Sequence, residues 1–177
     1  MESLDQISYF IITATAGHDT TSATISGGMK ALLEHPDQLA KLRDNPDLAK
    51  SAAKEMIRWV SPVRHMMRTT TEDFELRGKT LKAGDNLCLW YPAANRDGEA
   101  IDDPDTFNIE RDNRNQLAFG FGGHMCLGQH LAILEVELFF QELLPRLAHI
   151  ELASDPDWVQ AIFVGGLKSM PVNYTFK

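Results

Sequence analysis

Residues Leu4 to His35 contain no proline, and their composition predicts one long helix. The run is apolar at first and then rich in alanine, threonine, serine and glycine. Pro36 follows it, and a proline inside a helix removes a backbone hydrogen bond, so we expect the helix to end there.

Two further helices are predicted from the spacing of apolar residues. One spans residues 47–60, between a polar turn at 45–47 and Pro62. Its apolar residues recur at helical spacing: Leu48, Ala52, Met56, Trp59 and Val60. The other runs from about Cys126 to Ala148.

The rest of the chain favours strands and irregular structure. Residues 63–92 alternate apolar with polar residues between glycine turns, which predicts a small antiparallel sheet. Residues 92–125 show little periodicity, and so long an irregular stretch in a compact domain is usually functional. A last hairpin is predicted from Ile162 to Phe176, turning at Gly165 and Gly166. The order of elements favours a mainly α fold with a small antiparallel β part over a doubly wound α/β fold.

The composition suits one globular domain and excludes several functions. The 177 residues include 17 Lys and Arg against 25 Asp and Glu, so the net charge is −8 and no basic cluster is present to bind nucleic acid. The two cysteines, Cys88 and Cys126, form no disulfide framework. The apolar runs are shorter than the roughly 20 residues that cross a bilayer, and no signal peptide is evident. We therefore expect a cytoplasmic protein without a membrane span.

The segment Phe119–Ala132 places Cys126 between a glycine-rich loop and the start of an amphipathic helix. Glycines let the backbone approach a flat ligand closely, and a helix N-terminus stabilises a thiolate. His124 adds a cationic donor beside such a ligand. A dinucleotide loop would need a glycine at Met125, and a zinc site would need paired Cys or His ligands. A buried core cysteine beside a turn is the open alternative.

Two other patterns have both a structural and a functional interpretation. Glu55 and Arg58 lie one helical turn apart, which is also the spacing of an ordinary surface ion pair. The run Ala16–Thr21 places Gly17 inside the long helix, where glycine costs roughly 1 kcal/mol relative to alanine. This run is a helix irregularity, an N-cap formed by Asp19 or Thr20, or a bulge whose small residues form a pocket beside an acid and an alcohol.

Taken together and in this order, these patterns resemble the C-terminal half of a bacterial cytochrome P450. The heme-loop pattern is complete from Phe119 to Ala132, Glu55 and Arg58 match the Glu-x-x-Arg pair, and Ala16–Thr21 matches the oxygen-helix signature. The resemblance covers essentially all 177 residues. It implies that residues 1–177 are the C-terminal part of a single cytochrome P450 domain whose N-terminal half is absent.

The resemblance implies a heme b cofactor with Cys126 as the axial thiolate ligand of its iron. His124 and Arg68 would pair with the heme propionates. The matched motifs imply four more residues that contact the cofactor: Phe119, Gly122, Gly128 and Ala16.

Three other groups of residues follow from the same resemblance. A buried triad would hold the heme-side core, formed by Glu55, Arg58 and Arg111. Two catalytic residues would relay protons during oxygen activation, namely Asp19 and Thr20. An apolar substrate pocket would be lined by Thr15, Val63, Met66, Phe163 and Val164.

The implied function is a heme-thiolate monooxygenase that hydroxylates a hydrophobic substrate, such as a terpenoid, a sterol or an alkyl chain, with O2 and two electrons. The detailed pattern looks most like the terpineol and sterol-side-chain hydroxylases. Because no flavin or nicotinamide motif is present, a ferredoxin with its reductase would supply the electrons, and Lys79 and Arg114 could meet this acidic partner. The alternative is a truncated, inactive remnant that binds heme loosely or not at all. Its exposed apolar residues Tyr9–Ile12 would then promote aggregation or oligomerisation.

Overall fold

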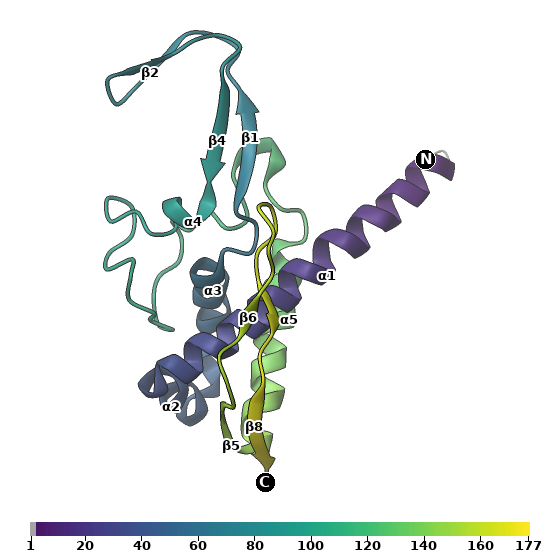
Figure 1. Cartoon of the computed structure of the whole chain (residues 1–177), viewed down its shortest axis with the longest axis vertical. Helices are drawn as coiled ribbons and strands as arrows, with labels where there is room; N and C mark the ends of the chain where they lie inside the picture. Colours follow the sequence, from purple (N-terminus) through teal and green to yellow (C-terminus); the bar gives the residue numbers. More distant parts are fainter. Residues whose placement is uncertain (1–2) are drawn as a thin grey trace.

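A computed structural model describes residues 3–177 of the chain. Figure 1 shows its helices, which are α1 (Ser3–Glu34), α2 (Pro36–Asp44), α3 (Ala49–Val60), α4 (Tyr91–Ala94) and α5 (Gln129–Leu143). Three short 3-10 turns accompany them: η1 (Pro46–Leu48), η2 (Gly122–His124) and η3 (Leu144–Arg146). The strands are β1 (His65–Thr69), β2 (Phe74–Leu76), β3 (Lys79–Leu81), β4 (Asn86–Trp90), β5 (Leu147–Leu152), β6 (Asp157–Trp158), β7 (Leu167–Ser169) and β8 (Val172–Phe176).

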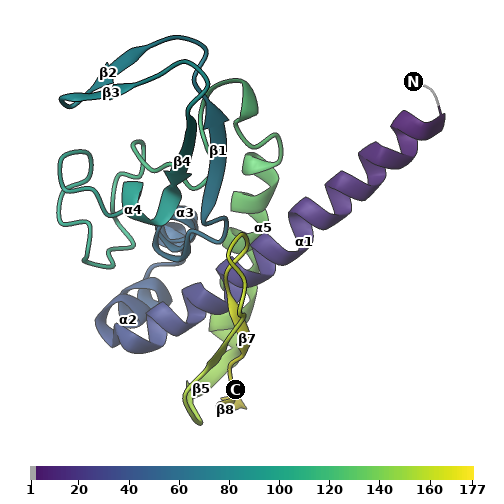
Figure 2. The same ribbon diagram turned by 45° about the horizontal axis from the view of Figure 1, so that its top comes forward.

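The long N-terminal helix is confirmed, and it is regular. α1 passes through Gly17 without interruption, so the predicted irregularity, N-cap or bulge at Ala16–Thr21 is wrong. The Thr20 hydroxyl donates to the Ala16 carbonyl at 2.7 Å, one turn back, as threonine side chains inside a helix commonly do. The first half of α1 projects away from the other elements in both views (Figures 1 and 2).

The structure corrects the interpretation of the residues that directly follow α1. Residues 36–44, for which the sequence pattern predicted no helix, form α2. Pro36 occupies the first turn of that helix, where its missing N–H has no hydrogen bond to lose. α1 therefore ends near the predicted position, but the chain resumes a helix at once.

The predicted antiparallel sheet over residues 63–92 is confirmed as two separate pairs. β1 pairs with β4, with Met67 opposite Cys88, and β2 pairs with β3 in a hairpin that extends beyond them. Figure 2 shows this hairpin at the outer end of the β1–β4 ribbon.

The predicted C-terminal hairpin is wrong in its partners. β7 pairs with β6, while β8 pairs with β5. Residues 162–164 do not form the first strand, because Val164 bridges Val63 and the N–H of Gly165 donates to the carbonyl of Pro62 at 2.8 Å. The backbone groups of this segment are thus used by a distant part of the chain.

The third helix is also shorter than predicted. α5 starts at Gln129 because the preceding residues form a loop closed by backbone hydrogen bonds. It ends at Leu143, where the chain tightens into the 3-10 turn η3, and Leu147 then pairs with Phe176 of β8.

The core lies where α1, α3 and α5 pack against one another. Its largest apolar members are buried Leu32, Met56, Phe107, Ile109, Val136 and Phe140. Gly28 of α1 allows α3 to approach closely, because a Cβ atom at this position would lie 2.7 Å from the sulfur of Met56. Within residues 3–177, every helix is too short or too polar to span a lipid bilayer.

Candidate functional site

Cys126 lies in the loop between the irregular segment and α5. Its backbone N–H donates to the carbonyl oxygen of Phe119 at 2.9 Å, which closes the loop on itself. Gly120 and Gly122 have φ of +72° and +73°, where a side chain would be strained. The thiol is free and exposed, just before α5 begins, so the alternative of a buried core cysteine is wrong.

The surface of this loop is open and apolar. A Cβ atom on Gly122, Gly123 or Gly128 would meet no atom within 4 Å. His124 is exposed, and Phe119 is half-buried at the start of the loop. Large apolar side chains are exposed in and just after the loop, namely Phe121, Leu127 and Leu131. The loop therefore offers one sulfur ligand beside exposed apolar side chains and uncovered glycines.

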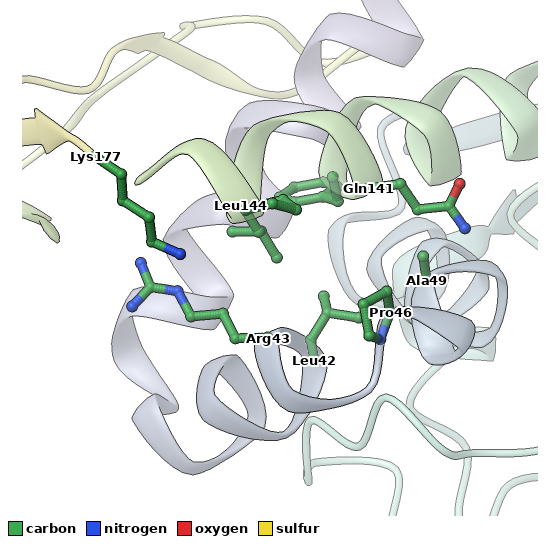
Figure 3. Close-up of a pocket in the computed structure, with 9 residues that line it drawn as sticks. Leu42, Arg43, Pro46, Ala49, Gln141, Leu144 and Lys177 are labelled. Atoms are coloured by element: carbon green, nitrogen blue, oxygen red, sulfur yellow. The ribbon is translucent and has the colours of Figure 1, made fainter. Parts of the chain in front are cut away.

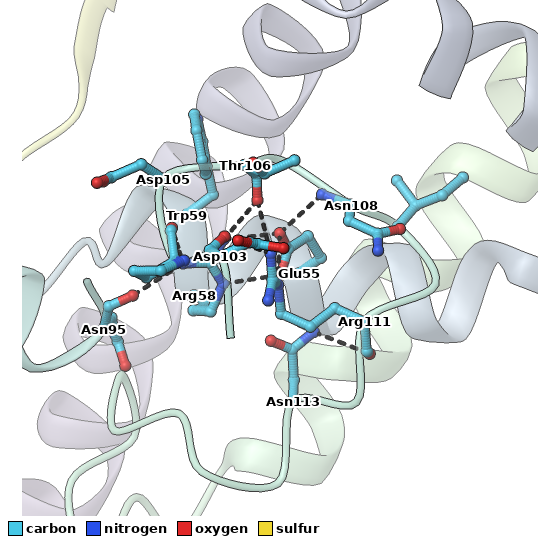
Figure 4. A network of polar contacts seen from close by, with 12 residues as sticks. Glu55, Arg58, Trp59, Asn95, Asp103, Asp105, Thr106, Asn108, Arg111 and Asn113 are labelled. Atoms are coloured by element: carbon cyan, nitrogen blue, oxygen red, sulfur yellow. Dashed lines mark hydrogen bonds and ion pairs between the residues drawn. The ribbon is translucent and has the colours of Figure 1, made fainter. Parts of the chain in front are cut away.

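Glu55, Arg58 and Arg111 meet in the interior beneath the irregular segment (Figure 4). Arg58 Nη2 donates to Glu55 Oε1 at 2.7 Å, and Arg58 Nε donates to Glu55 Oε2 at 2.8 Å. Arg111 Nε lies 3.3 Å from Glu55 Oε2. Both members of the α3 pair are completely buried, so the interpretation as a surface ion pair is wrong.

Backbone groups of the irregular segment complete this network. Arg58 Nη1 donates to the carbonyl oxygens of Asn95 and Pro104, each at 2.8 Å. The N–H of Asn108 donates to Glu55 Oε1 at 2.9 Å. The segment lacks periodicity because the buried ion pair, and not a repeating helix or strand, supplies its hydrogen-bond partners.

Asn95 is a structural member of the site that the sequence analysis did not assign. It is completely buried, its Nδ2 donates to Ser61 Oγ at 2.8 Å, and its Oδ1 accepts from the N–H of Leu117 at 2.7 Å. This one side chain thus joins the end of α3 to the chain that leads into the cysteine loop. A single buried asparagine leaves no periodic pattern that could have revealed it.

Arg96 was also missed, and it adds a third arginine to the network. Its guanidinium carbon lies 3.9 Å from the ring centroid of Trp59, a cation–π contact. Burial lowers the pKa of Arg96, and the positive charge of Arg58 lowers it further. Asp105, 3.5 Å from Arg96 Nε, offsets part of this repulsion at the surface.

Asp19 and Thr20 lie next to each other on α1 but make separate contacts. Asp19 Oδ1 is 2.8 Å from Nδ1 of His18, and both side chains are largely exposed. The Thr20 hydroxyl is bonded to the carbonyl of Ala16. The structure places these residues on the half of α1 that is exposed, ahead of its first buried residue, Ala23.

The expected substrate residues are brought together only in part. Val63 bridges Val164, and the N–H of Arg64 donates to the carbonyl of Phe163 at 2.9 Å. Met66 lies farther along β1, opposite Leu89. Thr15 is on α1, where its hydroxyl donates to the carbonyl of Ile11 at 2.8 Å.

The residues expected to meet the propionates lie on different elements. Arg68 is half-buried on β1, opposite Leu87, and its Nη1 donates to the carbonyl of Met67 at 2.7 Å. His124 ends η2 in the cysteine loop. Figure 1 shows β1 beside the segment that leads into α5.

Comparison with known proteins matches this sequence to one family. The sequence model of the family "Cytochrome P450" matches residues 7–158. This chain belongs to the cytochrome P450 family. It is 47% identical over 167 residues to cytochrome P450-terp of a Pseudomonas species, covering 94% of this chain and 39% of the relative. It is 44% identical over 161 residues to the steroid C26-monooxygenase of Mycolicibacterium smegmatis, covering 90% of this chain and 40% of the relative.

A solved P450 structure has the same fold. The crystal structure of CYP108D1 from Novosphingobium aromaticivorans superposes with a TM-score of 0.90 at 45% identity, over 96% of this chain and 41% of that one. The predicted fold class, mainly α with small antiparallel sheets in part of a P450 fold, is therefore confirmed. The chain spans about two fifths of the length of the curated relatives that it matches.

The residues of the cysteine loop fit the heme that the P450 family implies. One exposed thiol, glycines with free space above them and exposed apolar side chains suit a porphyrin iron with a single protein ligand. Residues 3–177 contain no group of three His, Cys, Asp or Glu that could hold a bare metal ion instead.

Proposed function

We propose that this P450 chain carries the heme-binding half of a monooxygenase that hydroxylates a hydrophobic substrate with O2 and two electrons. The observation that carries the proposal is the free, exposed thiol of Cys126 in a closed glycine loop directly before α5. On this proposal, residues 1–177 form the C-terminal part of a single P450 domain.

Cys126 would bind the iron of heme b. When bound, the heme would supply oxygen activation, which a thiolate ligand promotes by donating electron density. Gly122 and Gly128 would let the loop approach the porphyrin closely, with Phe119 and Ala16 as apolar contacts. His124 and Arg68 would donate to the propionates as charge-assisted hydrogen-bond donors.

The remaining residues would support the cofactor and the reaction. Glu55, Arg58 and Arg111 would hold the irregular segment, and with it the cysteine loop, in position. Thr20 would turn its hydroxyl away from the Ala16 carbonyl and donate a proton toward the dioxygen substrate. Asp19 would exchange protons with water, because its carboxylate is exposed.

The substrate would be a terpenoid, a sterol or an alkyl chain. Two relatives, cytochrome P450-terp and the steroid C26-monooxygenase, support an apolar substrate by their names. Val63, Phe163 and Val164 would form one apolar wall of its pocket, because backbone contacts hold these three residues together. Met66 on β1 and Thr15 on α1 would contact the substrate from separate elements.

A ferredoxin with its reductase would supply the electrons. Lys79, on the exposed β2–β3 hairpin, would be a contact for an acidic partner. Arg114 is a weaker candidate than expected, because its Nη2 lies 2.6 Å from Asp112, which already balances its charge.

The test is the reduced, carbon-monoxide-bound difference spectrum of the full chain mixed with hemin. The unchanged chain and a Cys88→Ser variant, whose thiol lies on β4, should both show the red-shifted Soret band of thiolate ligation. Cys126→Ser should lose it. A band typical of histidine or thiol ligation, or no binding at all, would argue for the inactive remnant.

A further inference from the structure

We infer a second binding site in this chain, at the end of α5 opposite to Cys126, for a small organic anion with an apolar body. It lies about 20 Å from the cysteine loop, since α5 rises ~1.5 Å for each of its residues. None of the residues that line it belongs to the proposed heme site, so the inference does not rest on the proposed function.

The site is a half-open cavity of about 230 Å³ bordered by α2, η1, the start of α3 and the C-terminal end of α5 (Figure 3). Its apolar wall consists of Leu42, Ala49, Phe140 and Leu144, with Pro46 and Pro145 at its edges. These four wall residues belong to the buried core, so the wall is rigid. At about 30 Å³ per water molecule, the cavity has room for about eight water molecules, or for an organic ion with a similar number of non-hydrogen atoms.

Arg43 and Lys177 bring two positive charges to this cavity, and Figure 3 shows their side chains pointing toward each other. Nε and Nη2 of Arg43 are buried and have no hydrogen-bond partner. In the described part of the chain, neither residue forms an ion pair, and none of the cavity residues is acidic.

The position of Arg43 explains why a positive charge is favourable there, but it does not explain why Nε and Nη2 have no acceptor. It lies in the last turn of α2, where the negative end of the helix dipole favours a cation. That interaction does not satisfy the guanidinium N–H groups, and buried donors are rarely left without an acceptor. A bound anion would supply the acceptor and relieve the repulsion between the two cations.

Lys177 is held beside the cavity by the sheet. Its backbone N–H donates to the carbonyl of Arg146 at 2.9 Å, directly after β8 pairs with β5. The Cα atom of Lys177 is therefore fixed, and only the side-chain torsions have to become ordered when the amino group contacts an anion.

These features together define the ligand. A carboxylate presents two oxygens that match the fork of an arginine, and the apolar wall takes the rest of the molecule. An inorganic ion would leave that wall in contact with water. The ligand class is therefore an aromatic or short aliphatic carboxylate, with benzoate and hexanoate as probes.

The test is calorimetric titration of the full chain with each probe, up to about 10 mM so that weak binding is detected. The expected result is saturable binding of at least one probe. Arg43→Met, which keeps the apolar stem, should weaken it about tenfold or more, and Lys177→Gln should weaken it less. Arg146→Gln is the matched control, because Arg146 points to Glu142 at the surface and should leave binding unchanged.

Other outcomes would overturn the proposal. Failure of both probes to bind would do so, as would binding that survives Arg43→Met. Benzamide binding as tightly as benzoate would show that the site does not recognise the negative charge. Phosphate binding as tightly as benzoate would show that the apolar wall does not contribute to binding. Should Arg43→Met fail to fold, Lys177→Gln and the benzamide comparison decide the matter, because Lys177 is exposed.

Discussion

Arg58 and Glu55 form two parallel hydrogen bonds, of 2.7 and 2.8 Å, between side chains that are completely buried (Figure 4). A desolvated pair is stable only if its remaining donors and acceptors are satisfied. Carbonyl groups of Asn95 and Pro104 satisfy the guanidinium, so the pair ties α3 to the irregular segment. The shape of the segment that leads to Cys126 therefore depends in part on this contact.

Breaking the pair should destabilise the protein strongly. Arg58→Met leaves Glu55 as a buried carboxylate without its main partner, and we expect a loss of about 3–5 kcal/mol in the free energy of unfolding. Urea denaturation measures it. Arg77→Gln is the control, because Arg77 pairs with Glu99 at an exposed site, where water screens the charges and little or no loss of stability is expected. An equal loss of unfolding free energy in the two variants would contradict the expectation that the buried pair contributes more to stability than the exposed one.

Two glycines of α1 should respond to alanine in opposite directions. Gly28→Ala would press a methyl group against buried Met56, and overpacking should cost about 1–3 kcal/mol. Gly17 has open space around it in a regular helix, so Gly17→Ala should raise the stability by roughly 0.5–1 kcal/mol. Denaturant titration of both variants tests this, and a stabilising Gly28→Ala would show that α1 and α3 pack less closely than described.

The two exposed cysteines should be distinguishable by a thiol reagent. The heme-free chain should react at both Cys88 and Cys126. Hemin should slow modification of the Cys88→Ser variant by about tenfold or more, since a metal-bound thiolate is no longer a free nucleophile. In Cys126→Ser, the remaining thiol should react at the same rate with and without hemin. Protection in both variants would mean that hemin covers the protein without specific ligation.

The β2–β3 hairpin should show a pH response below the ordinary range of aspartate. Lys82 Nζ donates to Asp73 at 2.6 Å, and this bond, with one from the N–H of Ala83, lowers the pKa of Asp73. Because the folded-state pKa lies below the unfolded one, the stabilisation is present above the ordinary aspartate pKa and is lost as the pH falls through the lowered value.

Carboxyl carbon NMR titration measures this effect. Lys82→Gln should move the midpoint of Asp73 upward. The midpoint of Asp112, which a separate bond from Arg114 lowers, should stay where it is. An unchanged Asp73 midpoint in Lys82→Gln would contradict the assigned cause.

Local patterns predicted the elements whose hydrogen bonds are local. The long first helix, the helix ending at Val60 and the paired strands of residues 63–92 follow from spacing, turns and proline positions, and the structure confirms them. The errors lie where a distant segment competes. α5 ends early because Leu147 pairs with Phe176, and Val164 leaves the predicted hairpin to bridge Val63.

The sequence by itself determined the family, because the cysteine loop and the Glu-x-x-Arg pair are short motifs whose spacing is preserved along the chain. The tertiary structure alone decided that Glu55 and Arg58 are buried and that Asn95 joins α3 to the cysteine loop. It also decided that Arg43 meets Lys177 beside one cavity. The reason is physical: a motif reflects contacts within a few residues, whereas burial and charge balance depend on which distant segment covers each side chain.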